Sequence, residues 1–474
     1  MQPRAARPSP AEPQARESLA GTVVNHLPFV TCEQASLASQ MKKVLFCVHD
    51  FPGTGGGGCF NLVKYLPRYG YLPIVLTNTH RHSEVEKRLL NSLDASVRIY
   101  ETSCISRSPF RVFSKLFGWP RLAGFLDRLV FMPDICVTGL VPAAVRAIRL
   151  VRAQKVECII TSSPPESFHL IGLLTKKLTG CKWVGHFRDL WTTKSIAHPA
   201  ATPVHSWTQR KLERFVYQRV DHLVANTYGN RDVYTTSFQV PVERITVITN
   251  GYDATESLRC ASAHADMGSR VFRLGYLGYF DKPHFPWQQF LVALNGIAKP
   301  APPGSLELRI AGYVSETARA FIERNGMFSF VKLYGVLSHS EAYALIAQSD
   351  VNIVLHYETG YSKAIVPHKL YHYLGMHKPI LGIGEEDGEM ASIIKETKVG
   401  RTVSIHNEGG VHRELLSLFN EWQKNGQIGY MGEHERIERY EIQALTRLLA
   451  ETIREASATH MASGKSPLRG HPLS

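Results

Sequence analysis

The sequence predicts an α/β protein with two doubly wound parallel-sheet domains in tandem. Two observations support this fold class. Short, continuously apolar runs alternate with helical patterns, as expected for strands covered by helices on both faces of a parallel sheet. The alternation stops in a small, polar stretch at 254–268, a predicted linker, and then starts again, so the chain divides into two similar halves.

The first half begins with a buried strand pattern and repeats it along the chain. The predicted strands are 43–49, 73–78, 156–163, 182–187, 221–227 and 245–250, and the predicted helices are 59–70, 166–180 and 204–219. This pattern gives an N-terminal Rossmann-like domain over 41–253.

The second half repeats the pattern and predicts a second Rossmann-like domain over 254–435. Its predicted strands are 272–278, 305–312, 330–335, 350–356 and 378–384, and its predicted helices are 340–349 and 367–377. Residues 1–40, which are rich in Pro, Ala and Arg, and residues 457–474 are predicted to be disordered. Because Met41 directly precedes the first strand, the sequence leaves open whether Met1 or Met41 is the natural start.

The composition favours an acidic partner and a reducing compartment. The chain has 474 residues, a formal net charge of +13 and a pI of about 9.3. No nucleic-acid recognition motif is present, so no nucleic-acid partner is expected. No apolar run reaches the roughly 18 residues of a membrane-spanning helix. The eight cysteines form no C-x-x-C pair and no zinc spacing with histidines, so we expect reduced thiols, no metal site and a cytoplasmic protein.

A glycine-rich loop, HDFPGTGGGGC, follows the first strand at 49–59. It matches the G-x-G-x-x-G dinucleotide fingerprint, but His49 to Pro52 separate the glycines from the strand, and the next strand ends at Asn78 without a carboxylate. The Lys-Ser/Thr pair of a phosphate-binding loop is also missing. The loop is therefore either a permissive turn that begins a helix or a backbone surface that a substrate approaches closely.

Several short motifs follow in order along the chain. They are Phe51-Pro52 with the glycine-rich loop, TSSPP (161–165), HFRDLW (186–191), ITNGYD (248–253), GYLG (275–278), GVLSH (335–339), PHKLYHYL (367–374) and KPIL (378–381). In this order and spacing they resemble retaining glycosyltransferases of family 4, bacterial GT-B enzymes that build surface polysaccharides and glycolipids. The resemblance spans about 41–456.

The resemblance implies a GT-B fold and a retaining, hexosyltransferase-type glycosyltransferase. The enzyme would move a sugar from a nucleoside diphosphate sugar, with UDP or GDP expected, to a polysaccharide, lipopolysaccharide or lipid-linked acceptor. No metal or other cofactor is expected. The N-terminal domain would bind the acceptor, the C-terminal domain the donor, and a helix at 436–456 would return to the N-terminal domain. The cleft between the carboxyl edges of two sheets agrees with where doubly wound folds bind ligands.

The resemblance also places the donor site. Lys282 and Lys363 are expected to contact the diphosphate, and Pro367 begins a helix whose first amides point at it. The donor-binding candidates are Gly278, Tyr279, Lys282, Gly312, Val336, Leu337, Lys363, Pro367, His368, Lys369 and His372.

Two positions depart from the family pattern. Ala364 and His372 stand where relatives have glutamates that contact the donor sugar and the ribose. Glu385, Glu386 and Glu389 follow the next strand and can partly compensate. Two alternatives stay open: a sugar-nucleotide epimerase or hydrolase of GT-B fold that uses the same donor site, and a catalytically silent binding or scaffold protein, which the two departures suggest.

HFRDLW ends a predicted strand, so its polar residues should face the cleft. Asp189 and His186 are the catalytic candidates, since a carboxylate can take a proton from an acceptor hydroxyl. In the alternative, Asp189 has a structural role or only positions the acceptor. The acceptor-binding candidates are Gly55, Gly56, Gly57, Gly58, Ser163 and Arg188.

Residues 106–152 carry eight Arg or Lys against two Asp, interleaved with aromatic residues. One interpretation is an amphipathic helical pair packed on its own domain. The other is a basic, aromatic face that lies on anionic lipid. The second would make the protein peripheral on the inner face of the membrane.

Overall fold

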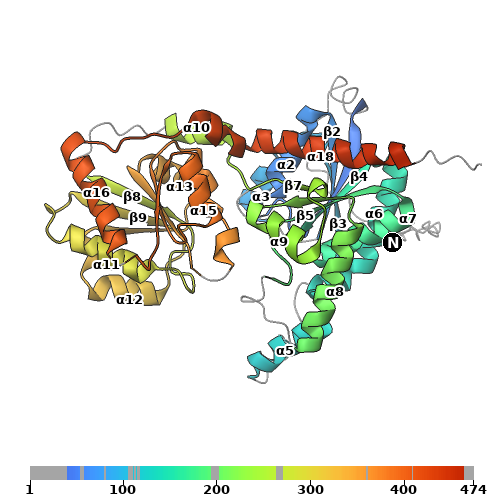
Figure 1. The fold of residues 1–474 in the computed structure, drawn as a ribbon, viewed down its shortest axis with the longest axis horizontal. Coiled ribbons are helices and arrows are strands. Elements are labelled where there is room, and N and C mark those ends of the chain that lie inside the picture. The colour runs from blue at the N-terminus through green and yellow to red at the C-terminus, as the bar shows by residue number, and fades with distance from the viewer. Residues whose placement is uncertain are drawn as a thin grey trace, which may run out of the picture.

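The computed structural model describes residues 40–463, except 54–57, 79–81, 105–109, 111–113, 115–117, 194–201, 263–270, 359–360 and 408. Two domains lie side by side, each with a parallel sheet between layers of helices (Figure 1). The predicted fold class, two doubly wound parallel sheets, is confirmed. Gly55, Gly56 and Gly57 lie outside the described residues.

The N-terminal sheet has seven parallel strands in the order β3-β2-β1-β4-β5-β6-β7. They are β1 (Lys42–Cys47), β2 (Tyr71–Asn78), β3 (Arg98–Thr102), β4 (Cys158–Ser163), β5 (Lys182–Phe187), β6 (His222–Ala225) and β7 (Ile245–Val247). The helices of this half are α2 (Cys59–Tyr65), α3 (Glu84–Leu90), α5 (Pro120–Val130), α6 (Leu140–Gln154), α7 (Ser167–Thr179), α8 (Pro203–Arg219) and α9 (Tyr228–Phe238), with short helices η1 (Leu66–Tyr69), η2 (Ile135–Gly139) and η3 (Val242–Arg244).

The C-terminal sheet has six parallel strands in the order β10-β9-β8-β11-β12-β13. They are β8 (Phe272–Leu277), β9 (Leu306–Ala311), β10 (Val331–Gly335), β11 (Val351–Leu355), β12 (Ile380–Ile383) and β13 (Gly400–Val403). The helices are α11 (Trp287–Ala298), α12 (Glu316–Arg324), α13 (His339–Ala347), α14 (Lys369–Leu374), α15 (Glu389–Glu396), α16 (Gly410–Asn425) and α17 (His434–Ile437), with η4 (Met327–Ser329), η5 (Ser362–Ala364) and η6 (Glu438–Tyr440).

Strand order reverses at β1/β4 in one sheet and at β8/β11 in the other. These reversals open crevices at the carboxyl edges of the strands, where doubly wound sheets bind ligands. Each sheet has an apolar core on both faces, because its central strands are buried throughout. The predicted site therefore depends on how the two carboxyl edges face each other.

The stretch that joins the domains differs from the predicted linker. It begins with helix α10 (Ala254–Ser262). Asp253 Oδ1 accepts a hydrogen bond from the backbone N–H of Thr255, 3.1 Å away, and so caps the helix start. Asp253 also bonds Lys64 Nζ (3.0 Å) and the Tyr65 hydroxyl (2.6 Å), which fixes the joint to α2.

The last helix, α18 (Ile442–Ser463), runs back along the N-terminal domain (Figure 1). Its apolar face, with Leu449 and Ile453, packs in one core with Phe46 of β1 and Phe60 of α2. Where the chain returns to the N-terminal domain, two backbone hydrogen bonds join it to Tyr252. The Tyr252 N–H donates to Tyr440 O (3.1 Å), and the Ile442 N–H donates to Tyr252 O (2.9 Å).

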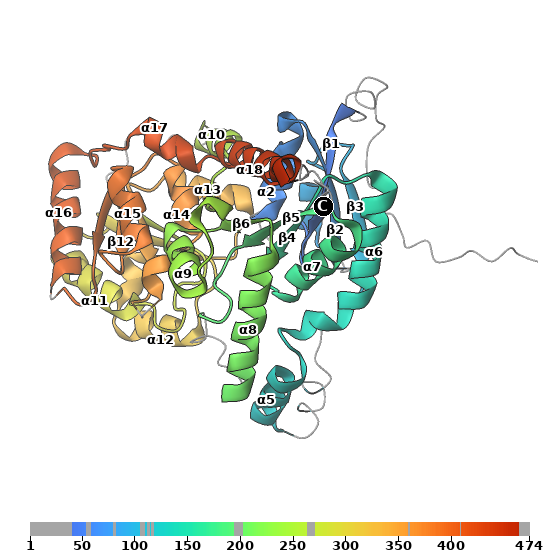
Figure 2. The same cartoon turned by 45° about the vertical axis from the view of Figure 1, so that its right-hand side comes forward.

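Helix α5 projects from the N-terminal domain beside α8 (Figures 1 and 2). Only Ala123 of this helix is buried. No single described helix is long and apolar enough to cross a membrane, whereas α5 together with the η2–α6 segment, bent by 50°, meets the length and composition.

Candidate active site between the two domains

His186 reaches the carboxyl edge of the N-terminal sheet at the end of β5. It is paired with Ser162 of β4 in the sheet register, and Ser162 Oγ lies 3.4 Å from its Nδ1. Cys59, at the start of α2, places its Sγ 3.6 Å from the same nitrogen. Burial, and then the charge of Arg188, lower the pKa of His186 to about 3, so the imidazole is neutral at physiological pH and a weak base.

Arg188 follows β5 and lies between the two domains. A Cβ added to Gly58 would lie 3.0 Å from its guanidinium, so the absence of a side chain at Gly58 makes room for it. Its Nε is buried and meets no hydrogen-bond acceptor among the described residues. In the C-terminal domain, burial and then the charge of Arg188 lower the pKa of His368 to about 4. The guanidinium is therefore a cation that faces both domains.

Asp189 is next to Arg188 on the same edge. Burial, and then the charge of Asp189, raise the pKa of Tyr357, which follows β11 in the C-terminal domain. The pair Arg188-Asp189 thus places one cation and one anion at the boundary between the domains.

Glycines end three adjacent strands at the facing edge of the C-terminal sheet. The N–H of Gly278 donates to Ala311 O (2.8 Å), and the N–H of Gly312 donates to Gly335 O (2.7 Å). Gly312 has φ 137°, and a Cβ there would lie 2.2 Å from Gly278 O, so only glycine fits. A ligand can therefore approach the backbone closely at this edge, because these residues have no side chains.

Lys369, the first residue of α14, holds its ammonium over the ring of Tyr276, 3.6 Å from the ring centroid. Burial, and then the charge of Lys282, keep the pKa of Lys369 well below its usual range. In the described part of the chain no carboxylate pairs with Lys369 or with Lys282. A bound anion would favour the charged ammonium form of Lys369, so these two neighbouring lysines, which have no counterion among the described residues, are suited to binding an anion.

Lys363 differs from these two lysines. Its Nζ lies 2.6 Å from Asp387 Oδ2, and both side chains are exposed. The pair raises the pKa of Lys363 through the hydrogen bond to Asp387. Lys363, which was predicted to contact the diphosphate, therefore already has a carboxylate partner within the protein.

Three histidines gather where α14 meets α13. The ring of His372 lies 4.6 Å from that of His368 and 5.8 Å from that of His339, and its Nδ1 is hydrogen-bonded to the Tyr343 hydroxyl. Burial holds the pKa of His372 well below its usual range. Because Tyr343 occupies Nδ1, His372 can offer a ligand only Nε2.

The domains touch directly beside this site. The Thr227 hydroxyl donates to Ala364 O (2.8 Å), and a Cβ on Gly229 would lie 2.7 Å from the Cβ of Ala364. The N–H groups of Tyr228 and Gly229, at the start of α9, donate to the two carboxylate oxygens of Glu389 at 3.0 and 3.1 Å. Figure 2 shows α9 against the C-terminal domain.

The remaining predicted residues border the same region. Ser163 is buried at the end of β4, and its Oγ meets no partner among the described residues. Tyr279 packs edge-on against Tyr313, with ring centroids 4.7 Å apart. Val336 is 85% exposed, whereas Leu337 is half-buried against the C-terminal core. Pro367 precedes α14, and its carbonyl accepts from the Leu370 N–H (2.9 Å).

The glutamates that follow β12 are engaged inside the protein. Glu385 accepts from the Ser362 hydroxyl (2.9 Å), Glu386 accepts from the N–H of Ser404 (2.8 Å), and Glu389 binds α9. Each of the three therefore already has a hydrogen-bond partner within the protein.

Sequence patterns did not indicate Glu213, which supports the site from α8. It is fully buried, accepts from the Tyr217 hydroxyl (2.8 Å) and is bonded by both the N–H and the hydroxyl of Thr192. Thr192 is the last residue of the segment 188–192, which carries Arg188 and Asp189. Glu213 thus fixes the position of that segment.

A hollow lined by Pro379, Lys398 and Arg401 lies at the amino ends of β12 and β13. Of the site residues described above, only Glu386 lines it, and Glu386 accepts a hydrogen bond from Ser404. Most of this hollow therefore lies at the edge of the sheet opposite the candidate site.

Part of the N-terminal domain matches a known family model. Residues 73–251 match the family model described as the glycosyl transferase 4-like domain. A comparison with curated proteins finds no matching sequence.

Solved structures of similar fold cover most of the chain. A glycosyltransferase from Rickettsia africae ESF-5 has 15% identity and a TM-score of 0.56 over 88% of this chain and 98% of its own. Sucrose-phosphate synthase from Thermosynechococcus elongatus has 13% identity and a TM-score of 0.61 over 88% and 100%. An alpha,alpha-trehalose 6-phosphate synthase from Burkholderia multivorans has 10% identity and a TM-score of 0.60 over 90% and 100%. At these identities the likeness establishes the fold, which is GT-B.

Proposed function

We propose that this chain, a GT-B protein with a glycosyl transferase 4-like domain, is a glycosyltransferase that uses a nucleoside diphosphate sugar. The observation that carries the proposal is the group of cations at the facing edges, Arg188 from one domain and Lys282 and Lys369 from the other. None of them has a carboxylate partner among the described residues. A departing nucleoside diphosphate is the kind of charge that such a group stabilises.

In the proposed reaction the sugar keeps its anomeric configuration. The acceptor oxygen bonds to the anomeric carbon on the face that the diphosphate leaves, the bond from that carbon to the diphosphate oxygen breaks, and the acceptor proton passes to the leaving diphosphate. Side-chain cations supply the charge stabilisation, so the proposal needs no metal ion. Asp189 orients the acceptor hydroxyl beside Arg188, and His186, which is neutral, contributes a hydrogen bond.

The departures from the family pattern fit a closed contact between the domains. A glutamate in place of Ala364 would extend into the start of α9, because Gly229 already touches the Ala364 side chain. The sugar would therefore be held by backbone at Gly278 and Gly312 and by the cations, rather than by a glutamate at this position.

The test measures binding and turnover separately. Thermal shifts with UDP, GDP and ADP identify the nucleotide, and consumption of the matching sugar nucleotide is then followed with and without a polysaccharide or lipid-linked acceptor. Acceptor-dependent release of the nucleoside diphosphate is expected. Donor hydrolysis or epimerisation without acceptor would instead identify the epimerase or hydrolase alternative, and binding without any turnover would identify a silent protein.

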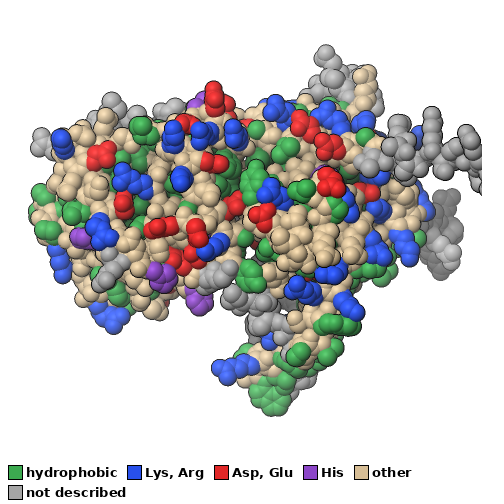
Figure 3. Space-filling view, viewed as in Figure 1, with side chains coloured by type: hydrophobic (Ala, Val, Ile, Leu, Met, Phe, Trp, Pro, Cys, Tyr) green, Lys and Arg blue, Asp and Glu red, His purple; other side chains and the backbone are tan. Residues whose placement is uncertain are grey.

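We further propose that the acceptor is lipid-linked and that the α5 projection lies on an anionic membrane. Apolar side chains that reach solvent on this helix and its N-cap are Trp119 (65% exposed), Leu122, Phe125, Leu129 and Val130. Arg121 and Arg128 lie on the same helix. Figure 3 shows hydrophobic side chains with Lys and Arg among them on this projection, at the bottom of the view. A basic, apolar helix of this kind binds the headgroup region of anionic lipid.

Vesicles of phosphatidylcholine with phosphatidylglycerol test the membrane proposal. The double variant Trp119→Ser and Leu122→Ser should bind these vesicles at least about tenfold more weakly than the wild type. Val292→Ser removes an exposed valine from α11 of the other domain and should leave vesicle binding unchanged. Equal binding by both variants and the wild type would refute a membrane role for α5.

A further inference from the structure

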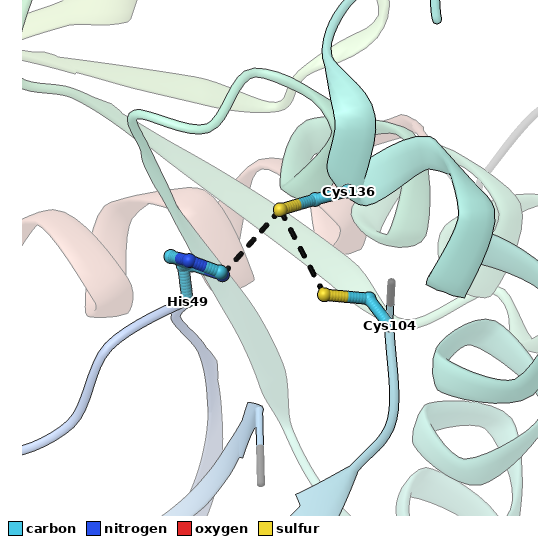
Figure 4. A group of neighbouring side chains, drawn as sticks. All are labelled: His49, Cys104 and Cys136. Atoms are coloured by element: carbon cyan, nitrogen blue, oxygen red, sulfur yellow. Dashed lines mark hydrogen bonds between the residues drawn. The ribbon is translucent and has the colours of Figure 1, made fainter. Parts of the chain in front are cut away.

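Three side chains that are distant in sequence meet at the carboxyl edge of the N-terminal sheet. His49 follows β1, Cys104 follows β3, and Cys136 lies in η2. One ligand atom from each, the imidazole nitrogen and the two sulfurs, lies within 4.8 Å of the other two. Figure 4 shows the three side chains pointing toward one another from three separate segments.

The distances among these atoms fit a tetrahedral metal site. The two sulfurs are 3.9 Å apart, and Cys136 Sγ is 3.6 Å from His49 Nδ1. With Zn–S bonds of about 2.3 Å and Zn–N bonds of about 2.0–2.1 Å, two ligands of a tetrahedral zinc lie about 3.8 Å apart for a sulfur pair and about 3.5 Å apart for sulfur and nitrogen. Two of the three separations are therefore already near those that the ion requires, and the third, between Cys104 and His49, is within 4.8 Å.

The candidate ligand atoms of His49 and Cys104 also face one common point. Asn78 Nδ2, from the end of β2, lies 2.5 Å from His49 Nδ1 and 2.9 Å from Cys104 Sγ, so the imidazole and the thiol both face the same amide hydrogens. A cation at this point would replace the amide hydrogens. Turning the Asn78 amide would then present its Oδ1 as a fourth ligand.

Neighbouring contacts hold the ligands in place. Asp134 Oδ1 accepts from the Cys136 N–H (2.9 Å), and its Oδ2 accepts from the Ser167 N–H (2.8 Å), which ties η2 to the start of α7. The ring of His49 packs edge-on against Phe168, with centroids 5.8 Å apart. Such outer contacts are what orients ligands in metal sites.

We propose that His49, Cys104 and Cys136 bind one Zn²⁺ ion. Two thiolates and one imidazole in tetrahedral geometry favour zinc over magnesium or calcium, which prefer oxygen ligands. Binding breaks the two S–H bonds, forms two Zn–S bonds and one Zn–N bond, and releases two protons to solvent. No oxidant or reductant takes part.

The position of the site gives the ion a structural role. Cys104 and Cys136 flank the part of the chain that contains α5, so the ion would close the base of that projection. The role would be independent of the donor site, because the cations of the donor site lie on other segments.

Cobalt binding to the full-length protein tests the proposal. The protein is stripped of metal with a chelator under reducing conditions and titrated with Co²⁺, whose bonds to thiolates give a near-ultraviolet charge-transfer band. One equivalent should bind, with the band, and Zn²⁺ should displace it. Cys104→Ser and Cys136→Ser should each lose the band and weaken binding at least about tenfold.

Cys59→Ser is the matched control. Cys59 Sγ also lies 3.6 Å from a histidine nitrogen, that of His186, but no second cysteine joins this pair among the described residues. This variant should bind cobalt as the wild type does. Circular dichroism of each variant shows whether it is folded, and His49→Ala provides a second loss-of-ligand variant that retains both thiols.

Three outcomes would overturn the proposal. They are the absence of a stoichiometric cobalt band in the wild type, loss of the band in Cys59→Ser, and an intact mass two hydrogens lighter that maps to a Cys104–Cys136 disulfide. None of these measurements depends on glycosyl transfer.

Discussion

Lys369 and Lys363 lie on one short segment but have different surroundings. The Lys369 side-chain nitrogen lies over the ring of Tyr276, and no carboxylate among the described residues pairs with it. Lys363, in contrast, pairs with Asp387 at 2.6 Å. Lys369→Met should therefore weaken binding of the nucleoside diphosphate about 10- to 100-fold, as expected for loss of a charged hydrogen bond of roughly 1.5–3 kcal/mol. Isothermal calorimetry with UDP and GDP measures this difference.

Lys363→Met is the control for this prediction, because its charge is already paired, and its affinity should change less than about twofold. Lys282→Ala should weaken binding severalfold, since its ammonium is near Lys369 but exposed. Equal losses in Lys363→Met and Lys369→Met would show that the diphosphate does not distinguish the two lysines, and would contradict the assignment of Lys369.

Individual contacts were only partly predictable from the sequence. The strand ends that carry His186, Arg188 and Gly278 follow from apolar runs and turn residues, so their edge of the sheet could be inferred. The residues that contact the predicted site residues could not be inferred. Asp387 beside Lys363 and Gly229 beside Ala364 come from distant parts of the chain, and no local pattern reports such contacts. Catalytic and binding roles, and the limits of the domains, remain predictions.

Helix α8 determines the position of the Arg188–Thr192 segment through one buried carboxyl group. Burial raises the pKa of Glu213 to about 7, although hydrogen bonds from Thr192 and Tyr217 partly oppose this shift. The folded protein thus holds the proton more tightly than the unfolded chain. Below pH 4.5 both states are protonated and this stabilisation is complete, and it is lost as the pH rises through about 7.

Glu213→Gln should remove that pH dependence, because the amide stays neutral at every pH. Between pH 4.5 and 8 the unfolding free energy of the wild type should fall relative to that of the variant by about 3 kcal/mol, from a shift of about 2.5 pKa units. Urea denaturation across this range measures the difference. Comparing the two proteins cancels the opposite contribution of the buried histidines, whose pKa values are lowered. Parallel profiles would contradict the assignment.

Elements with continuous apolar runs were predicted well, and two of the four edge strands were missed. Strand β5 was predicted over the residues that form it, 182–187. The edge strands β3 (RIYET) and β13 (GRTV) lack such runs, whereas the edge strands β7 and β10 lie within the predicted strands 245–250 and 330–335. Helix α10 was mistaken for a linker, since its sequence is polar and its start depends on the cap from Asp253.

The two domains are connected by a carboxylate at a helix start. Glu389 binds the first N–H groups of α9, where a negative charge is stabilised by the helix dipole. Glu389→Lys should shift the equilibrium between closed and open domains toward the open form by about 1–2 kcal/mol, roughly 5- to 30-fold. Small-angle X-ray scattering should show a larger radius of gyration for this variant without ligand.

Glu386→Lys is the corresponding control. Glu386 accepts from Ser404 within the C-terminal domain and forms no hydrogen bond or ion pair with α9 among the described residues, so reversing its charge should leave the radius of gyration unchanged. If both reversals expand the protein equally, or neither does, the contact between Glu389 and α9 does not hold the domains together.

The return of α18 to the first sheet determines the order in which the protein can be completed during translation. Part of the apolar face that carries Phe46 is covered by a helix that leaves the ribosome only after the entire second domain. At roughly 5–20 residues per second, the ribosome needs roughly 10–40 s to pass from Tyr252 to Ile442. During that interval the nascent first domain exposes an unfinished hydrophobic surface, and the second domain can fold before the first is complete.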